Sequence, residues 1–223
     1  QVRLVEKYHT DFERSGATLS VDDKEKYRQL STELSKVTLD FGQNNLRETN
    51  AYEMLLTDRS ELVGLPETLV EAAAAKAKSK EKEGWLFDLT APSYMGFMKY
   101  SSRRDLREKL YMAYNTKSVK GGPYDNQENI QKIVNLRLEI ARLLGYDKYS
   151  EFVLKNRMAK NDTAVFELLD ELAAAFGPVA HQELDDVQEY ARQLEGSSFE
   201  IQPWDWSYYA DKLREDRFAL SDE

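Results

Sequence analysis

Apolar residues recur at helical spacing along most of the chain. In the first long segment they lie three and four positions apart, which predicts a helix from about 22 to 47. A similar stripe predicts a helix over 126–144 that ends at Gly145, because glycine readily adopts the left-handed conformation that closes helices. We interpret the first stripe as core-facing; it contains Tyr27, Leu30, Leu34, Val37 and Phe41.

Between these two helices the pattern changes to short apolar runs separated by turns. Residues 52–57 and 85–89 predict two short strands that pair as a hairpin on a helical body. The alanine-rich run 72–77 predicts a surface helix, since alanine and lysine favour helices but bury little. A further helix is predicted over 94–114, and its solvated outer face carries four basic residues, Arg103, Arg104, Arg107 and Lys109.

The last third of the chain again predicts helices. A short one covers 150–157, and Asn161 can cap a longer one that turns inward the stripe Val165, Leu168, Leu169, Leu172 and Phe176. Pro178 predicts a kink or break, because proline lacks a backbone donor and clashes with the preceding turn. After Pro203 a final helix is predicted, with Asp205 as its cap.

These elements together predict a mainly α protein. We expect an irregular bundle of about seven to nine helices, with at most a small two-stranded β element near 52–57 and 85–89. The helical part is expected to cover 1–223, with a possible sub-boundary at 118–125, where Gly121, Gly122 and Pro123 form a linker signal. No period of about 20–50 residues recurs, so the sequence does not indicate a repeat array.

Composition narrows the expected partners. The 40 acidic residues outnumber 31 basic ones and give a net charge of -9, which repels phosphate backbones, so we expect no nucleic acid. No apolar run approaches the roughly 20 residues that cross a bilayer, so we expect no membrane. The absence of cysteine excludes disulfides, thiolate metal ligands and a thiol nucleophile.

Candidates for catalytic chemistry are few. A zinc hydrolase needs two or three imidazoles or carboxylates on the metal, and the only histidines are His9 and His181. After His181, the position that a His-Glu-x-x-His motif requires to be histidine is Asp185. Neither a Gly-x-Ser-x-Gly elbow nor a phosphate-binding loop is present. We therefore expect no catalytic residue and no metal ligand in this chain.

One aromatic group near the end of the chain favours a functional role. It consists of Trp204, Trp206, Tyr208 and Tyr209, and rings of this kind can line a groove that holds a peptide. We name these four as candidate substrate-channel residues. Packing within a core or between domains is the competing interpretation of the same rings.

Several stretches have a distinctive order of residues, above all Gln-Pro-Trp-Asp-Trp-Ser-Tyr-Tyr-Ala at 202–210, with 218–220. The others are residues 12–20, 65–69, 91–100, 106–114, 125–126, 136–137, 143–146 and 158–160. Together these stretches resemble the thimet oligopeptidase, oligopeptidase A and peptidyl-dipeptidase family of zinc metallopeptidases. The stretch 202–210 is similar to a segment that peptidyl-dipeptidases carry shortly before their catalytic region, so we expect the peptidyl-dipeptidase subgroup.

This resemblance implies the amino-terminal helical half of a peptidase that hydrolyses short peptides. Such a half forms one wall of a deep channel, and the zinc ligands of the family would lie beyond residue 223. The chain alone would then bind no zinc and be inactive, and its partners would be short peptides and the carboxy-terminal catalytic half. No signal-peptide pattern is visible in the sequence, which favours the cytoplasm as the compartment. Its start at Gln1 and end at Ser221, Asp222 and Glu223 favour a fragment. The alternative is a non-enzymatic helical module that binds proteins or peptides.

Overall fold

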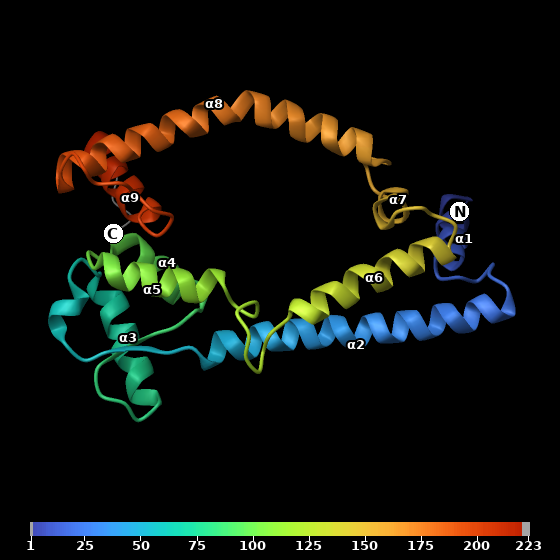
Figure 1. Ribbon diagram of the computed structural model, residues 1–223, viewed down its shortest axis with the longest axis horizontal. Helices are drawn as coiled ribbons and strands as arrows, with labels where there is room; N and C mark the ends of the chain where they lie inside the picture. Colours follow the sequence, from blue (N-terminus) through green and yellow to red (C-terminus); the bar gives the residue numbers. More distant parts are fainter. Residues whose placement is uncertain (1, 220–223) are drawn as a thin grey trace. The chain divides into compact units, whose positions relative to one another are not determined.

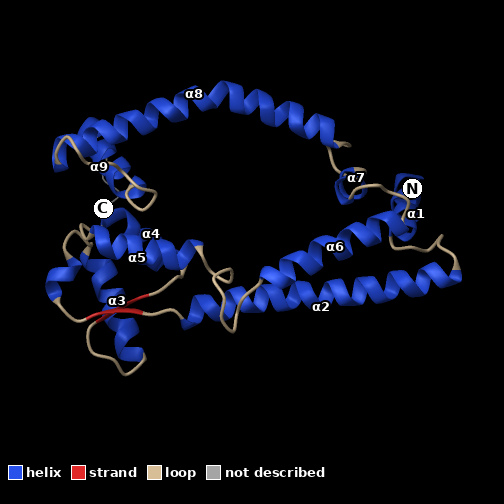
Figure 2. Cartoon of the chain, in the orientation of Figure 1, coloured by secondary structure: helices blue, strands red, loops and turns tan. Residues whose placement is uncertain are grey.

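A computed structural model describes residues 2–219, which are mainly helical (Figure 1). The expected fold class is confirmed, since one two-stranded sheet accompanies the helices of this part of the chain (Figure 2). Gln1 and residues 220–223, including Leu220, lie outside the described residues. The elements are α1 (Val2–Arg14), α2 (Val21–Ala51), β1 (Met54–Leu56), the 3₁₀ helix η1 (Arg59–Leu62), α3 (Glu67–Ser79), β2 (Trp85–Phe87), α4 (Ala91–Tyr100), α5 (Arg104–Asn115), α6 (Gln127–Leu143), α7 (Tyr149–Leu154), α8 (Asp162–Glu195) and α9 (Trp206–Phe218).

The chain divides into two compact units, each made of two stretches of sequence. The first unit contains the residues up to Asn44 together with Asp125–Ala174. The second contains Asn45–Tyr124 together with the residues from Ala175 onward. Helices α2 and α8 contribute residues to both units. The assignment of 1–223 to a larger peptidase, with a sub-boundary at 118–125, stays a prediction.

In the first unit a buried amide fixes where α6 begins. The Asn126 side chain is 1% exposed and lies at the N-cap of α6. Its Nδ2 donates to the backbone oxygen of Phe41 at 3.0 Å, and its Oδ1 accepts from Asn44 Nδ2 at 3.2 Å. Because a buried polar group is costly without partners, these bonds hold the start of α6 on α2.

In the second unit the core surrounds the small sheet. Strands β1 and β2 are antiparallel, with Met54 opposite Phe87, as the predicted hairpin requires. The Phe87 ring meets the edge of Phe97 on α4, with centroids 4.8 Å apart. Helix α3 is not a surface helix, as the sequence suggested, because it contacts β2 and buries Ala73 and Ala77. The small alanine side chain lets the helix approach the strand closely.

The prediction of a single helix over 94–114 is wrong, because α4 and α5 are separate helices. After α4, Ser102 leaves the helix and its backbone N–H donates to the oxygen of Val63 at 2.9 Å. The backbone oxygen of Ser101 accepts from Arg107 Nη1 at 2.7 Å. Side-chain periodicity could not reveal this break, since these backbone bonds leave the apolar spacing on either side intact.

Helix α8 confirms its predicted cap and corrects another expectation. Asn161 Oδ1 accepts from the backbone N–H of Ala164 at 2.8 Å. The helix continues through Pro178, which excludes the break but not the kink that was predicted there as its alternative. Val187 and Ala191 are buried. The stripe expected to face inward is 42% to 63% exposed at Leu168, Leu169, Leu172 and Phe176.

Candidate functional site

A buried ion network lies at the start of α9 and centres on Asp205. The Asp205 side chain is 0% exposed and that of Arg107 is 1% exposed. Arg107 Nη2 donates to Asp205 Oδ1 at 2.7 Å, and Arg104 Nη2 donates to Oδ2 at 2.8 Å. The backbone N–H of Gln202 also donates to Oδ2, at 2.9 Å. With both carboxylate oxygens bonded, the cost of removing these charges from water is offset.

This network corrects two interpretations of the sequence. Arg107 does not lie on a solvated face; its other donors bond the backbone oxygens of Ser101 and Trp204, at 2.7 and 3.2 Å. Asp205 occupies the N-cap position of α9, but its side chain makes no cap bond to the helix backbone. The partners are 101 and 98 residues apart along the chain, so local spacing could not indicate them.

The four candidate channel residues lie in different environments. Tyr208 and Tyr209 are 8% and 3% exposed, and their ring centroids are 5.0 Å apart. The Arg107 guanidinium lies 4.2 Å from the centroid of the Tyr208 ring. Trp204 is half-buried against the core around the sheet, whereas Trp206 is 38% exposed. The structure thus gathers three of the rings into packing positions, and the channel role of the group stays a prediction.

Tyr209 connects the start of α9 to the end of α8. Its hydroxyl donates to Glu195 Oε1 at 3.0 Å. Burial of the phenol, and after it this hydrogen bond, raise the pKa of Tyr209 above its ordinary value. The hydroxyl is therefore a neutral donor at physiological pH. Its role in this arrangement is to hold the two helices together.

Helix α9 also lines two open cavities. One has a volume of about 540 Å³ and lies between α4 and α9, where Asp211 accepts from Lys99 at 3.1 Å and from Arg214 at 2.8 Å. The other, of about 250 Å³, lies between α8 and α9, and its wall includes Trp206 and Phe218. Sequence reasoning missed the charged residues of the first cavity. The available signal was the spacing of Asp211 and Arg214, three positions apart on one helix.

The described residues do not fit a zinc site. Among residues 2–219 no group of three or more histidine, cysteine, aspartate or glutamate side chains is placed to hold a metal ion. His9 Nδ1 lies 3.4 Å from the exposed carboxylate of Glu13, and His181 Nδ1 lies 2.8 Å from the oxygen of Gly177 in its own helix. Within the same range, no helix has the length and apolar character needed to cross a membrane.

Comparison with known proteins identifies the family. A model of Peptidase family M3 matches residues 97–223. The whole chain is 36% identical to Oligopeptidase A of Haemophilus influenzae and of Escherichia coli, and covers 33% of each. Over 99% of its length it is 32% identical to the Dipeptidyl carboxypeptidase of Escherichia coli, of which it covers 32%. The chain therefore spans about a third of the curated relatives that it matches, and it belongs to Peptidase family M3.

The expected family is confirmed, and relatives of both subgroups match the chain. Identity is 36% to the oligopeptidase A relatives named above, and 32% and 28% to the dipeptidyl carboxypeptidases of Escherichia coli and Salmonella typhimurium. In the stretch 202–210 the side chains of Asp205, Tyr208 and Tyr209 are buried.

Proposed function

We propose that this chain is a helical part of a family M3 peptidase that hydrolyses short peptides, and that it lines the path of the peptide. The observation that carries this proposal is the match over the whole chain to proteins named as peptidases, of which it spans about a third. The partners are then short peptides and the catalytic half of the same protein. Catalytic groups are assigned to that other half.

A zinc ion belongs to the proposed activity through the family resemblance. When bound, it would polarise the scissile carbonyl and activate water. The described histidines His9 and His181 each lack the converging donors that zinc requires, so no catalytic step is assigned to residues 2–219. The contribution proposed for this chain is to bind and orient the peptide and to restrict its size.

The wall of the smaller cavity beside α9 is the surface we propose for peptide contact. Trp206 and Phe218 supply exposed rings there, and an ion pair between Arg217 and Asp186 at 2.8 Å lies at the same cavity. An apolar side chain of a peptide can pack on such rings while polar groups bind its backbone. The buried rings of Tyr208 and Tyr209 would then act only by holding α9 in position.

A cytoplasmic location is part of the same proposal. One relative from Arabidopsis thaliana, 34% identical, is named as a probable cytosolic oligopeptidase A, and another of equal identity is named as an organellar enzyme. Fractionation of the source cells, with an antibody raised against this chain, tests the location. Recovery of the protein from an organelle or from outside the cell would overturn it.

The activity is tested with this 223-residue chain and with the protein made from the uninterrupted gene. Bound zinc is measured by mass spectrometry and hydrolysis with a blocked short peptide. We expect zinc and hydrolysis in the longer protein and neither in the 223-residue chain. Inactivity of both would overturn the proposal and favour a helical module that binds peptides without cleaving them.

The contact surface is tested in the longer protein with Trp206→Ala. Losing the ring should raise KM about tenfold with little change in kcat, because the ring would bind the peptide equally well in the ground state and in the transition state. Trp206→Phe keeps a ring and should retain most of the affinity. The control is Phe166→Ala, since Phe166 is 61% exposed and lines neither cavity beside α9. An unchanged KM in Trp206→Ala would exclude this surface.

A further inference from the structure

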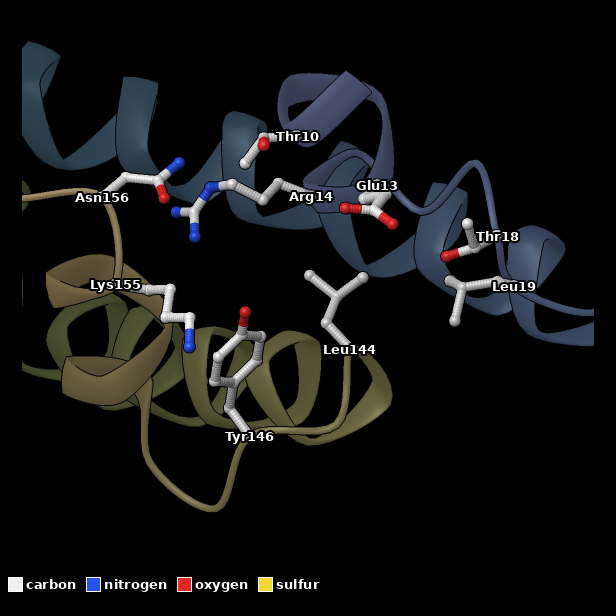
Figure 3. Close-up of a pocket in the computed structure, with 9 residues that line it drawn as sticks. All are labelled: Thr10, Glu13, Arg14, Thr18, Leu19, Leu144, Tyr146, Lys155 and Asn156. Atoms are coloured by element: carbon white, nitrogen blue, oxygen red, sulfur yellow. The ribbon is translucent and has the colours of Figure 1, made fainter. Parts of the chain in front are cut away.

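A polar cavity in the first unit uses no residue of α9. It has a volume of about 450 Å³ and lies where the ends of α1, α6 and α7 meet (Figure 3). The volume is within the range of sites that hold small molecules. Its lining combines hydroxyl, amide, cationic, acidic and apolar groups, among them Glu13, Arg14, Leu144, Tyr146, Lys155 and Asn156.

Two glycines shape the walls of this cavity. Gly16 follows α1 and Gly145 follows α6, with φ angles of +83° and +86°. Glycine adopts this left-handed conformation without the steric cost of a β-carbon, so the chain can reverse directly after each helix. After α6, the Tyr146 N–H donates back to the oxygen of Ala141 at 2.9 Å, which closes the helix end and places the Tyr146 ring at the cavity.

The Arg14 side chain is held in a fixed position without an acidic partner. Its Nη1 donates to the backbone oxygen of Phe152 at 2.7 Å, and its guanidinium carbon lies 4.0 Å from the centroid of the Phe152 ring. Within residues 2–219 this guanidinium forms no ion pair, although acidic residues outnumber basic ones, 40 to 31. A guanidinium has five N–H donors, so those left over can bind an anion.

A second cation points into the same space. Figure 3 shows the Lys155 ammonium, the Arg14 guanidinium and the Tyr146 hydroxyl turned toward one region of the cavity. In the described part of the chain, the Lys155 ammonium makes neither a hydrogen bond nor an ion pair. Two cations and a hydroxyl that converge in this way suit a carboxylate, which accepts several hydrogen bonds at once.

An acidic group lines another part of the cavity. The Glu13 carboxylate lies beyond the Leu144 side chain as seen from Lys155 (Figure 3). Its pair with His9 at 3.4 Å is weak, because the two side chains are 49% and 70% exposed. The carboxylate can therefore receive an ammonium group. The apolar Leu144 side chain between the two charged regions suits a ligand that carries opposite charges at its two ends.

We infer that this cavity binds a zwitterionic dipeptide. The free carboxylate of the dipeptide accepts hydrogen bonds from Arg14, Lys155 and the Tyr146 hydroxyl, and its ammonium group faces Glu13. Two extended residues span roughly 7 Å, which separates the two charges more than a single amino acid does. Inorganic phosphate would use only the cationic region, since the Glu13 carboxylate lies beyond the Leu144 side chain. Binding here is independent of the peptidase activity proposed above.

Titration calorimetry of the full chain with glycyl-leucine tests this assignment. We expect saturable binding, and loss of binding for glycyl-leucine amide, which lacks the carboxylate. N-acetyl-glycyl-leucine, which lacks the ammonium group, should bind about threefold to tenfold more weakly. Absence of binding to glycyl-leucine, or equally tight binding of inorganic phosphate, would overturn the assignment.

Variants locate the site. Lys155→Gln should weaken glycyl-leucine binding about tenfold, because a charge-assisted hydrogen bond is lost while the contacts of the folded chain are unchanged. Arg14→Gln should have the same effect or a larger one, with partial rescue by Arg14→Lys. The matched control is Arg3→Gln, an exposed arginine on α1 that does not line the cavity.

A third variant tests the acidic end of the cavity. Glu13→Gln should weaken the binding of glycyl-leucine but leave the binding of N-acetyl-glycyl-leucine unchanged, because only the first ligand has an ammonium group. Circular dichroism confirms folding of each variant, and Lys155→Gln decides the result if Arg14→Gln unfolds. Equal weakening by Arg3→Gln and Lys155→Gln would place the ligand elsewhere and overturn the inference.

Discussion

The two compact units differ in how their apolar faces are covered. In the second unit the sheet and the helices α3, α4 and α5 enclose a contiguous core, and α9 covers Val187 and Ala191. In the first unit, large apolar side chains of α1 and, on α8, those of Phe166, Leu168, Leu169 and Leu172 are exposed. A helical stripe therefore shows that a face is apolar, and it does not show what covers that face. The buried apolar side chains described in the first unit are Val37, Ile133, Ile140 and Ala141.

The largest difference should appear between two phenylalanines. Phe97, 0% exposed, packs against Phe87 in the core of the second unit. Phe97→Ala should lower the free energy of unfolding by about 4 kcal/mol, because it removes apolar burial and leaves a cavity. Phe166→Ala, at a side chain of the first unit that is 61% exposed, should change it by less than about 0.5 kcal/mol. Urea unfolding followed by circular dichroism measures both, and equal losses would show that the Phe166 face is buried in solution.

A second contrast separates a buried ion pair from an exposed one. Arg107→Ala should destabilise the chain by about 3 kcal/mol, because it removes one of the two cations that neutralise the buried Asp205 carboxylate. Arg103→Ala removes a 2.7 Å pair with Asp105 at side chains 38% and 62% exposed, and should cost less than about 1 kcal/mol. The same unfolding experiment compares them, and a larger loss in Arg103→Ala would contradict the structural role given to the network.

The first unit has a polar anchor that should have a smaller effect. Asn126→Ala should destabilise the start of α6 by about 2 kcal/mol, since the buried oxygen of Phe41 and the amide of Asn44 lose a partner. Amide hydrogen exchange at Ile130 measures the local change, because the Ile130 N–H donates to the backbone oxygen of Asn126 in the first turn of α6. Asn45→Ala, at an exposed position of α2, is the control. Unchanged exchange in Asn126→Ala would show that α6 starts independently of this amide.

The smallest effect concerns the pH dependence of stability that a partly buried carboxylate of the second unit, Glu53, contributes. Hydrogen bonds from Lys80 and Lys82 lower the pKa of Glu53 below its ordinary value. Because the folded pKa is below the unfolded one, the stabilisation is complete above the unfolded value of about 4.3 and is lost as pH falls through the folded value. Glu53→Gln should therefore be slightly less stable than wild type at pH 7 and equally stable at the lowest pH.

Urea titrations at several pH values measure this difference. Glu83→Gln, at an exposed glutamate in the adjacent turn, serves as the control for the loss of one surface charge. A difference for Glu53→Gln that grows as the pH falls would have the wrong sign, and would contradict the lowered pKa of Glu53.

Sequence patterns predicted the elements that depend on local chemistry. The strands near 52–57 and 85–89, the Asn161 cap and the end of α6 at Gly145 follow from the preferences of nearby residues. Patterns failed where the decisive partner is distant. The break between α4 and α5 depends on Val63 and Arg107, and neither can be read from the spacing of apolar residues within 94–114.

The candidate site shows the same limit. The stretch 202–210 was recognised as distinctive, but periodicity could not separate the exposed ring of Trp206 from the buried rings of Tyr208 and Tyr209. The cavity of the first unit was not found at all, because Arg14 and Lys155 are 141 positions apart and each resembles an ordinary surface cation. Only the folded chain brings them together.

The sequence by itself determined the mainly helical fold, the small sheet and the peptidase family. These depend on residue types and on their short-range spacing, which a linear chain contains in full. The tertiary structure decided that Arg107 is buried, that Asp205 joins two helices and that Arg14 and Lys155 line one cavity. Burial and charge pairing depend on which distant groups meet and exclude water, so they are properties of the folded chain alone.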